Sequence, residues 1–447
     1  MGKILFTGGS VIDPVGGRIR RADVLIENGL VKAVGARIKA PDAKKVDCRN
    51  RFLAPGFIDL HCHLREPGEE ISETIASGAW AAFASGFTQI CPMPNTNPAI
   101  DSEAMVRFEL EAARGVNGAR LIPVGCCTKG RQGKELAELG GMSMAGARAV
   151  SDDGNWVSDA NLMRRVLEYA KTFNLLVMSH CEVPELSLGL ADEGFVATRL
   201  GLPASPGIAE AIAAMRDIML AEWTGAPLHI CHVSSRETVE VLRWAKARGV
   251  AVTAETCPHY FTLTSEALGR EYDSNLRVNP PLRSELDRKA IVRALKDGTI
   301  DAISTDHAPH TSEEKEREFE AAAPGIIGFE TAFSLCYEVL VLKKVLTLPE
   351  LVARLSTAPA QILGLEPPAI EPGKEANLVL LDTEVRWEFS RERVLSRSFN
   401  TPFLGRMMRG KVVAVFLGEN YYFDSEFLGE QSEVGKFPKV GFKKTGA

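Results

Sequence analysis

The sequence lacks the features that mark several large classes of protein. Its formal net charge is −6, so it lacks the basic surplus typical of nucleic-acid-binding domains. No apolar run reaches the length of a membrane span, and the first residues soon become polar instead of forming the apolar centre of a signal peptide. We therefore expect neither a nucleic-acid partner nor insertion into a membrane.

The cysteines give no disulfide framework. All nine are scattered, mostly in apolar stretches, and the adjacent pair Cys126-Cys127 has no CxxC spacing. An odd number of cysteines without a pairing pattern is typical of a reducing compartment, so a cytoplasmic location is expected. A glycine-rich phosphate loop is also missing after the first long apolar strand, which argues against an open nucleotide-binding sheet.

The hydrophobic pattern divides the 447 residues into three blocks. Residues 1–54 contain short strand patterns with Gly-Gly and Asn-Gly turns, and residues 366–447 return to strand patterns before a lysine-containing tail. Residues 55–365 between them repeat a strand followed by a helix. We expect the two chain ends to form one small β-sandwich domain, and the tail beyond residue 430 to be partly disordered and solvated.

The central block contains eight strand-helix units. The strands are expected at residues 57–60, 87–91, 121–126, 147–151, 175–179, 228–233, 250–255 and 300–304. The first helix is expected over 71–85, with Ile71 on its apolar stripe, and the second is expected to begin at an N-cap on Asp101. Eight such units predict an α/β fold, a (β/α)8 TIM-like barrel, and the alternative is an open doubly wound sheet.

Candidate metal ligands lie where these strands end. His61 and His63 are two residues apart on the first strand, so their side chains point the same way. Barrel active sites form at the C-terminal ends of the strands. Four imidazoles and two carboxylates suit one or two zinc-like ions, although each residue alone could be structural. The remaining candidates follow strands four, five, six and eight: Asp153, His180, His232 and Asp306.

The acidic candidates have separate expected roles. Asp306 is the best candidate for the general base, because it can both bind a metal and take a proton from the attacking water. Another carboxylate can bridge two ions, and a water between them becomes acidic enough to attack near neutral pH. Asp152 competes with Asp153 for this bridge, and one of the two is expected to be a local cap or turn residue.

Six motifs identify a known family. They are PGFIDLHCHLR at 55–65, PMPNT at 92–96, SDDG at 151–154, ETCPH at 255–259, VNPPLR at 278–283 and TDHAPH at 305–310. Over nearly its whole length the chain resembles the amidohydrolase superfamily, and within it the class I dihydroorotases of pyrimidine biosynthesis. The resemblance implies one or two zinc ions on the six candidate ligands. It also implies substrate contacts by His63, Arg65, Asn95, Asn279, His310 and the Pro324-Gly325 turn.

The implied reaction is the reversible, metal-dependent conversion of (S)-dihydroorotate into N-carbamoyl-L-aspartate. Related cyclic amidases bridge their metals with a carboxylated lysine, and residues 149–153 contain no lysine. This difference favours dihydroorotase over dihydropyrimidinase, hydantoinase and allantoinase. A non-catalytic paralogue that partners aspartate carbamoyltransferase would have lost ligands, and this chain retains them all. The resemblance also allows a homo-oligomer and a complex with that transferase.

The expected substrate contacts have alternative explanations. The guanidinium of Arg65 can bind the carboxylate of dihydroorotate through two hydrogen bonds, or could instead pair with Glu66 or Glu69. Asn95 and Asn279 suit a polar ring, although turn chemistry also explains both. His310 could donate to the carboxylate or cap its loop.

Three further histidines, His229, His259 and His307, are expected to support the site or the fold. The charged stretch that begins at Thr311 and runs to Gly328 is expected to be a solvated face. Because it follows the eighth strand, it is also a candidate cover for the active site.

Overall fold

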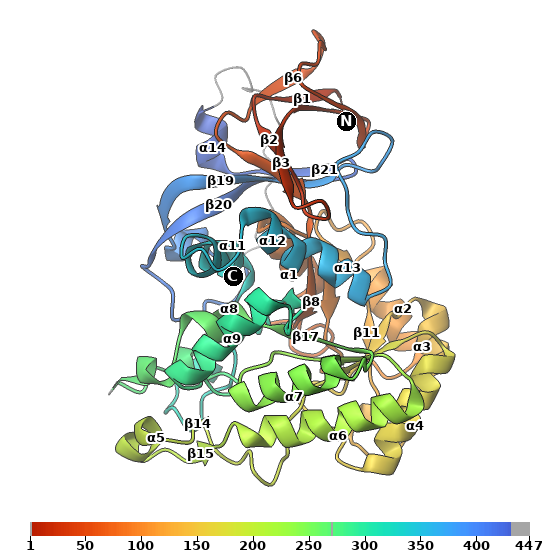
Figure 1. Ribbon diagram of the computed structural model, residues 1–447, viewed down its shortest axis with the longest axis vertical. Coiled ribbons are helices and arrows are strands. Elements are labelled where there is room, and N and C mark those ends of the chain that lie inside the picture. The colour runs from red at the N-terminus through yellow and green to blue at the C-terminus, as the bar shows by residue number, and fades with distance from the viewer. Residues whose placement is uncertain (1, 270, 431–447) are drawn as a thin grey trace.

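The computed structural model describes residues 2–269 and 271–430 (Figure 1). The predicted solvated tail therefore lies outside the described residues. A barrel occupies the lower part of the view in Figure 1, and a β domain that contains both the first and the last described strands lies above it.

The barrel is built from parallel strands in the predicted order. One sheet runs β10-β9-β8 and another β11-β12-β13-β16-β17-β18. The third position is interrupted, because β10 pairs with β9 whereas β11 pairs with β12. The strands are β8 Phe57–Cys62, β9 Phe87–Pro92, β10 Arg120–Leu121, β11 Val124–Gly125, β12 Ala149–Val150, β13 Leu176–Ser179, β16 Leu228–Ile230, β17 Val252–Thr256 and β18 Ala302–Ile303.

Backbone hydrogen bonds just beyond β18 close the barrel onto its first strand. The amide of Asp306 donates to the carbonyl of His61 at 2.9 Å, and the amide of His63 donates to the carbonyl of His307 at 2.8 Å. The barrel prediction is confirmed and the open sheet is excluded. These bonds also bring the ends of the first and last strands side by side, which is where the ligand motifs lie.

Helices follow the barrel strands and pack outside them (Figure 1). Asp159 caps α4, accepting from the amide of Leu162 at 2.7 Å. The longer helices are α1 Ile75–Ala84, α2 Glu103–Ala112, α3 Leu139–Ala145, α4 Ala160–Thr172, α6 Ile208–Thr224, α7 Arg236–Ala247, α9 Glu285–Asp297 and α11 Phe329–Cys336. The shorter ones are α5 Phe195–Leu200, α8 Pro258–Thr262, α10 Ser312–Lys315, α12 Leu348–Val352, α13 Ala358–Ile362 and α14 Ser425–Glu430.

Two predicted helix starts are wrong. The first helix begins at Ile75, because Thr74 and Ser77 form a reciprocal capping box there. Ile71 therefore lies before the helix and is 79% exposed. In the second helix the N-cap is Ser102. The Asp101 carboxylate instead accepts a hydrogen bond from the amide of Gly130 at 2.9 Å and ties a loop beside the barrel mouth.

Both chain ends build the β domain, as predicted. A six-stranded sheet has the order β21-β20-β19-β7-β2-β3, and a four-stranded sheet has the order β5-β4-β1-β6. The first contains β2 Ser10–Asp13, β3 Arg18–Arg21, β7 Phe52–Pro55, β19 Asn377–Glu388, β20 Met407–Leu417 and β21 Asn420–Phe423. The second contains β1 Ile4–Thr7, β4 Asp23–Glu27, β5 Leu30–Gly35 and β6 Lys44–Asp47.

One hydrophobic core joins the two sheets of this domain. Phe6 from the N-terminal part and Phe416 from the C-terminal part are buried in it, with ring centroids 5.2 Å apart in an edge-to-face arrangement. The domain is thus a β-sandwich that holds the two ends of the chain together. Strand β7 crosses the predicted boundary between residues 54 and 55. That boundary and the one at 365/366 stay predictions.

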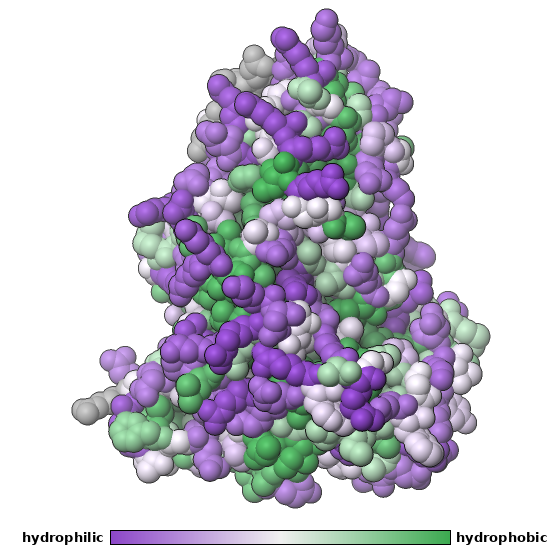
Figure 2. All heavy atoms as spheres, in the orientation of Figure 1, coloured by the Kyte–Doolittle hydropathy of each residue, from purple (hydrophilic) through white to green (hydrophobic). Residues whose placement is uncertain are grey.

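All nine cysteines are buried and free. Across residues 2–269 and 271–430, no helix is both long and apolar enough to cross a membrane. Figure 2 shows hydrophilic side chains interspersed with apolar ones over the whole visible face.

Candidate metal centre

The predicted ligands stand at or just after the C-terminal ends of the barrel strands. His61 lies in β8, and His180 directly follows β13. His232 and Asp306 follow β16 and β18 with positive φ angles of 35° and 48°. Such angles are uncommon for residues with a Cβ atom and are often found where a functional site imposes the backbone conformation.

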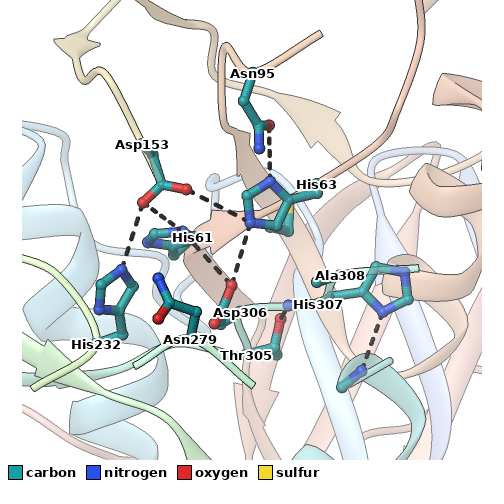
Figure 3. A network of polar contacts seen from close by, with 12 residues as sticks. His61, His63, Asn95, Asp153, His232, Asn279, Thr305, Asp306, His307 and Ala308 are labelled. Atoms are coloured by element: carbon teal, nitrogen blue, oxygen red, sulfur yellow. Dashed lines mark hydrogen bonds and ion pairs between the residues drawn. The ribbon is translucent and has the colours of Figure 1, made fainter. Parts of the chain in front are cut away.

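Asp153 is the centre of the cluster. Its Oδ1 atom lies 3.4 Å from the Nε2 atom of His61, the Nδ1 atom of His180 and the Nε2 atom of His232. Its Oδ2 atom is 3.7 Å from the Nε2 atom of His63. Figure 3 shows the Asp153 carboxylate facing His61, His63 and His232. One carboxylate therefore meets four imidazoles that come from three strand ends, those of β8, β13 and β16.

Asp306 approaches the same imidazoles from the eighth strand. Its Oδ1 atom lies 3.2 Å from the Nε2 atom of His63 and 3.6 Å from the Nε2 atom of His61 (Figure 3). Burial favours the protonated carboxyl group, but the hydrogen bond to His63 and the charge of nearby imidazoles outweigh it and lower the pKa of Asp306 to about 2. Asp306 is therefore ionised at neutral pH. The structure brings all six predicted ligands together.

The chemistry of the cluster fits a divalent metal. His61 is completely buried, and its Nδ1 atom lies 3.2 Å from the Oε1 atom of Glu255. Nevertheless, within the described chain neither ring nitrogen of His61 makes a hydrogen bond. Buried polar atoms without a partner are costly, and a bound cation removes that cost. Among the described residues, four groups have ligand atoms within 4.8 Å of one another, and two of them consist of predicted ligands: His61, His63 and Asp306, and His61, Asp153 and His232.

Asp152 has a different environment from Asp153. The amides of Cys127 and Thr128 donate to its Oδ1 atom at 2.9 and 3.0 Å, and the Thr128 hydroxyl donates to its Oδ2 atom. Of the two neighbouring carboxylates, Asp152 therefore holds the local backbone, whereas Asp153 faces the imidazoles.

A cavity of about 220 Å³ opens beside the cluster. Arg65 lies in its wall, where its Nε atom donates to the Pro309 carbonyl at 3.0 Å and its Nη2 atom is 3.1 Å from the Nε2 atom of His310. The predicted alternative, an ion pair with Glu69, spans 3.8 Å. The cavity is lined by His63, Arg65, Asn95, Asp153, Gly154, His180, His232, Asn279, Asp306, Ala308, His310, Pro324 and Gly325. Every predicted substrate contact is among them.

The two asparagines are anchored to the ligand side chains. The Oδ1 atom of Asn95 lies 2.9 Å from the Nδ1 atom of His63 (Figure 3). The amide group of Asn279 donates to Glu182 at 3.0 Å, and Glu182 itself lies 3.2 Å from the Nε2 atom of His180. Asn95 therefore orients the His63 imidazole directly, and Asn279 orients the His180 imidazole through Glu182. The turn chemistry considered from the sequence does not account for these contacts.

Sequence reasoning missed two acidic residues near the site. Glu182 follows His180 by two residues, the same spacing as His61 and His63, and this spacing could have revealed it. Glu255, in strand β17, is completely buried. It lies 3.6 Å from the Nε2 atom of His229 and beside His61. Its position in the seventh barrel strand, next to strand ends that carry candidate ligands, could have revealed it.

The three remaining histidines lie around this site. His229 contacts the Thr253 hydroxyl at 2.8 Å. His307 accepts a hydrogen bond from the amide of Gly328 at 3.1 Å and stacks on a phenylalanine ring. Burial lowers the pKa of His259 to about 4. His229, His259 and His307 therefore support the fold around the site, as expected from the sequence.

The charged stretch after the eighth strand is not uniformly solvated. Lys315, in the middle of its charge run, is only 4% exposed, so the prediction of a solvated face is wrong there. The Pro324-Gly325 end of the stretch forms part of the cavity wall. The stretch therefore contributes to the wall of the cavity.

Two solved cyclic amidases have this architecture. Dihydropyrimidinase from Brevibacillus agri matches with a TM-score of 0.81 and 25% identity, covering 94% of this chain and 95% of that one. L-hydantoinase from Arthrobacter aurescens matches in fold with a TM-score of 0.83 and 22% identity, covering 95% and 96%. Fold and ligand cluster together place the chain in the class of metal-dependent amidohydrolases.

Sequence comparisons narrow this class to one family. A family model described as Dihydro-orotase-like matches residues 50–238. Dihydroorotase from Geobacter metallireducens is 46% identical over 419 residues, which are 93% of this chain and 98% of that protein. Dihydroorotase from Pelobacter propionicus is 48% identical over 418 residues, again 93% and 98%. The chain belongs to the dihydroorotase family.

Proposed function

We propose that this chain is a zinc-dependent dihydroorotase that interconverts (S)-dihydroorotate and N-carbamoyl-L-aspartate in pyrimidine biosynthesis. The observation that carries the proposal is that one cavity contains both candidate metal ligands and donors to an anion. At one end the Asp153 cluster offers metal ligands, and at the other end Arg65 and His310 offer donors to an anion. Dihydroorotate has the matching pair of groups, a cyclic amide and a ring carboxylate.

The proposed ligands of one or two zinc ions are His61, His63, Asp153, His180, His232 and Asp306. When bound, the metal supplies a Lewis acid that polarises the amide carbonyl and lowers the pKa of the attacking water. Asp306 takes the proton of that water and passes it to the ring nitrogen that leaves, which an ionised carboxylate can do. In the reverse direction the same carboxylate removes the proton from the nitrogen that closes the ring.

The other residues position the substrate and the ligands. Arg65 binds the ring carboxylate with charge-assisted hydrogen bonds, and His310 at its side adds a further donor. Asn95 accepts from the Nδ1–H group of His63, and this leaves the Nε2 lone pair of that imidazole directed toward the cluster. Asn279 is held through its amide nitrogen by Glu182, so its oxygen is free to accept from a ring N–H group.

The decisive experiment is a hydrolysis assay of dihydroorotate beside dihydrouracil, hydantoin and allantoin, with metal analysis of the same preparation. We expect hydrolysis of dihydroorotate with the highest kcat/KM. Preferred turnover of another ring would replace the proposed substrate. The predicted cytoplasmic location, homo-oligomer and complex with aspartate carbamoyltransferase stay predictions of the sequence and its resemblance.

The first prediction concerns substrate choice. Arg65→Gln should lower kcat/KM for dihydroorotate about tenfold to a hundredfold, because a hydrogen bond to a charged group contributes about 1.5 to 3 kcal/mol. Residual activity on dihydrouracil should change much less, because that ring has no carboxylate. Kinetics with both rings, together with the metal content of the variant, isolate the effect. If both activities fall by the same factor, Arg65 maintains the structure of the site and does not bind the ring carboxylate.

The second prediction concerns the bridging group. Because Asp153 occupies the centre of the cluster and residues 149–153 contain no lysine, no lysine carboxylation is required. Activity of the metal-loaded protein should therefore be the same with bicarbonate added or removed. The measurement is initial velocity after dialysis against bicarbonate-free buffer and after readdition. Reactivation that depends on bicarbonate would reveal a modified lysine and contradict the proposed bridge.

A further inference from the structure

Lys315 is a buried cation without a carboxylate partner among the described residues. Its Nζ atom donates to the carbonyl of Ala323 at 2.8 Å and to the carbonyl of Gly325 at 3.1 Å, and it lies 3.5 Å from the carbonyl of Arg277. Burial lowers the pKa of Lys315 to about 8, with Arg277 adding to the decrease and Asp273 opposing it. The ammonium group is thus held almost entirely by backbone oxygens.

The segments joined by Lys315 both carry cavity residues. The Arg277 segment leads to Asn279, and the Ala323–Gly325 turn contains two residues of the cavity wall. A backbone hydrogen bond of 2.9 Å from the amide of Gly325 to the carbonyl of Arg277 links the same two segments. Lys315 therefore stands behind the cavity wall and fixes the distance between two of its parts.

The Ala323–Gly325 turn also contacts His310, which lies beside Arg65. The carbonyl of Pro324, between the two oxygens that Lys315 holds, lies 3.0 Å from the Nε2 atom of His310. That nitrogen is 3.1 Å from the Nη2 atom of Arg65. The fit is tight, because a Cβ atom added at Gly325 would lie 2.7 Å from the Cβ atom of Ala308 and 3.2 Å from the Nε2 atom of His310. A displacement of the turn would thus move His310.

We propose that Lys315 is a positioning residue for substrate binding: it holds the Ala323–Gly325 turn so that His310 and Arg65 are oriented to receive the ring carboxylate. This inference rests on the proposed function, because it assumes a carboxylate-bearing substrate. If this position served only packing, an apolar side chain would suit it better, since burying a lysine without a counter-charge is costly. Its hydrogen bonds to the turn account for a lysine at this position.

The test is Lys315→Met, which keeps an unbranched side chain as far as the ε position and removes the ammonium donors. We expect KM for dihydroorotate to rise about tenfold while kcat changes less than about threefold, because binding geometry is lost and the ligand cluster is untouched. Lys315→Gln keeps one donor group and should give an intermediate KM, which also covers the case in which the methionine variant does not fold. Unchanged KM in both variants would overturn the proposal.

Arg354→Met is the matched control. Arg354 also donates to two backbone carbonyls, those of Asp301 at 2.9 Å and Leu295 at 3.1 Å, but it does not line the cavity. Its replacement removes donors from two backbone carbonyls, as Lys315→Met does, and should leave KM unchanged. A rise of KM in the control equal to that in Lys315→Met would assign the effect to general destabilisation and overturn the positioning role.

A double-mutant cycle tests the route through His310. In a His310→Gln background, Lys315→Met should raise KM less than about twofold, because the residue through which it acts is already changed. If the increase in KM of the double variant equals the product of the increases in the two single variants, Lys315 does not act through His310. Absence of dihydroorotate hydrolysis by the wild-type protein would instead defeat the proposed function, so the two failures are distinguishable.

Discussion

Replacing Asp306 by asparagine is expected to lower kcat for dihydroorotate hydrolysis about a hundredfold to ten-thousandfold, the usual contribution of a general base. The amide has nearly the same size as the carboxylate and can still approach His63, whose Nε2 atom lies 3.2 Å from Oδ1 in the native protein. It cannot accept the proton of the attacking water. The fold and part of the metal content should remain, and steady-state kinetics with metal analysis measure both.

Asp301→Asn is the matched control for this variant. Asp301 lies just before the same strand, β18, where its carboxylate contacts the Nζ atom of Lys246 at 2.7 Å and accepts from the amide of Ala254 at 2.8 Å. Its replacement removes a carboxylate from the opposite end of the barrel and should leave kcat near the wild-type value. Near-wild-type kcat in Asp306→Asn would mean that another group is the base.

The barrel and the clustering of the candidate ligands could be predicted because both follow from short-range patterns. A strand that ends in His61-Cys62-His63 needs only its own sequence to be recognised, and the parallel topology then brings all such ends to one face. The strand lengths were less predictable. Strand β12 has two residues, Ala149 and Val150, where five were expected, because the chain after Val150 turns at once to deliver Asp153 to the cluster.

The residue pattern by itself left the choice between Asp152 and Asp153 open, and only the family resemblance favoured Asp153. The residues are adjacent and chemically identical, and their roles differ because Thr128 and its neighbour supply donors to one of them. Those donors lie about two dozen positions earlier in the chain, and no local sequence pattern predicts them. The local cap expected for one of the pair therefore became assignable only when the third and fourth strands were placed side by side.

The burial of Lys315 was mispredicted for a related reason. In sequence it lies among Glu313, Glu314, Glu316 and Arg317, and such a run is usually solvated. Its actual partners are the carbonyls of Arg277 and of the Ala323–Gly325 turn, which reach it from two different loops. A tertiary contact of this kind overrides the local charge pattern. The error at Ile71 has a local cause instead, because the capping box formed by Thr74 and Ser77 starts the helix after Ile71.

Metal depletion is expected to abolish turnover completely. The purified protein should contain about one to two zinc-like ions per chain, since the cluster offers four imidazoles and two carboxylates. Chelation should also lower Tm, because it returns the buried His61 nitrogens to a site in which they lack hydrogen-bond partners among the described residues. Metal analysis, Tm and initial velocity are measured on the same samples before chelation, after it and after readdition of zinc.

The neighbouring aspartates provide a matched pair of variants for this prediction. Asp153→Asn removes the carboxylate that lies 3.4 Å from three imidazole nitrogens, so the protein should lose most of its metal and its turnover together. Asp152→Asn removes a carboxylate that only caps the backbone of Cys127 and Thr128, so it should lower Tm while metal content stays near that of the wild type. Loss of metal in both variants to the same extent would contradict the assignment of the bridge to Asp153. Full activity of a demonstrably metal-free wild-type sample would contradict the metal-dependent mechanism itself, because Asp306 alone can move a proton but cannot polarise the amide that must be broken.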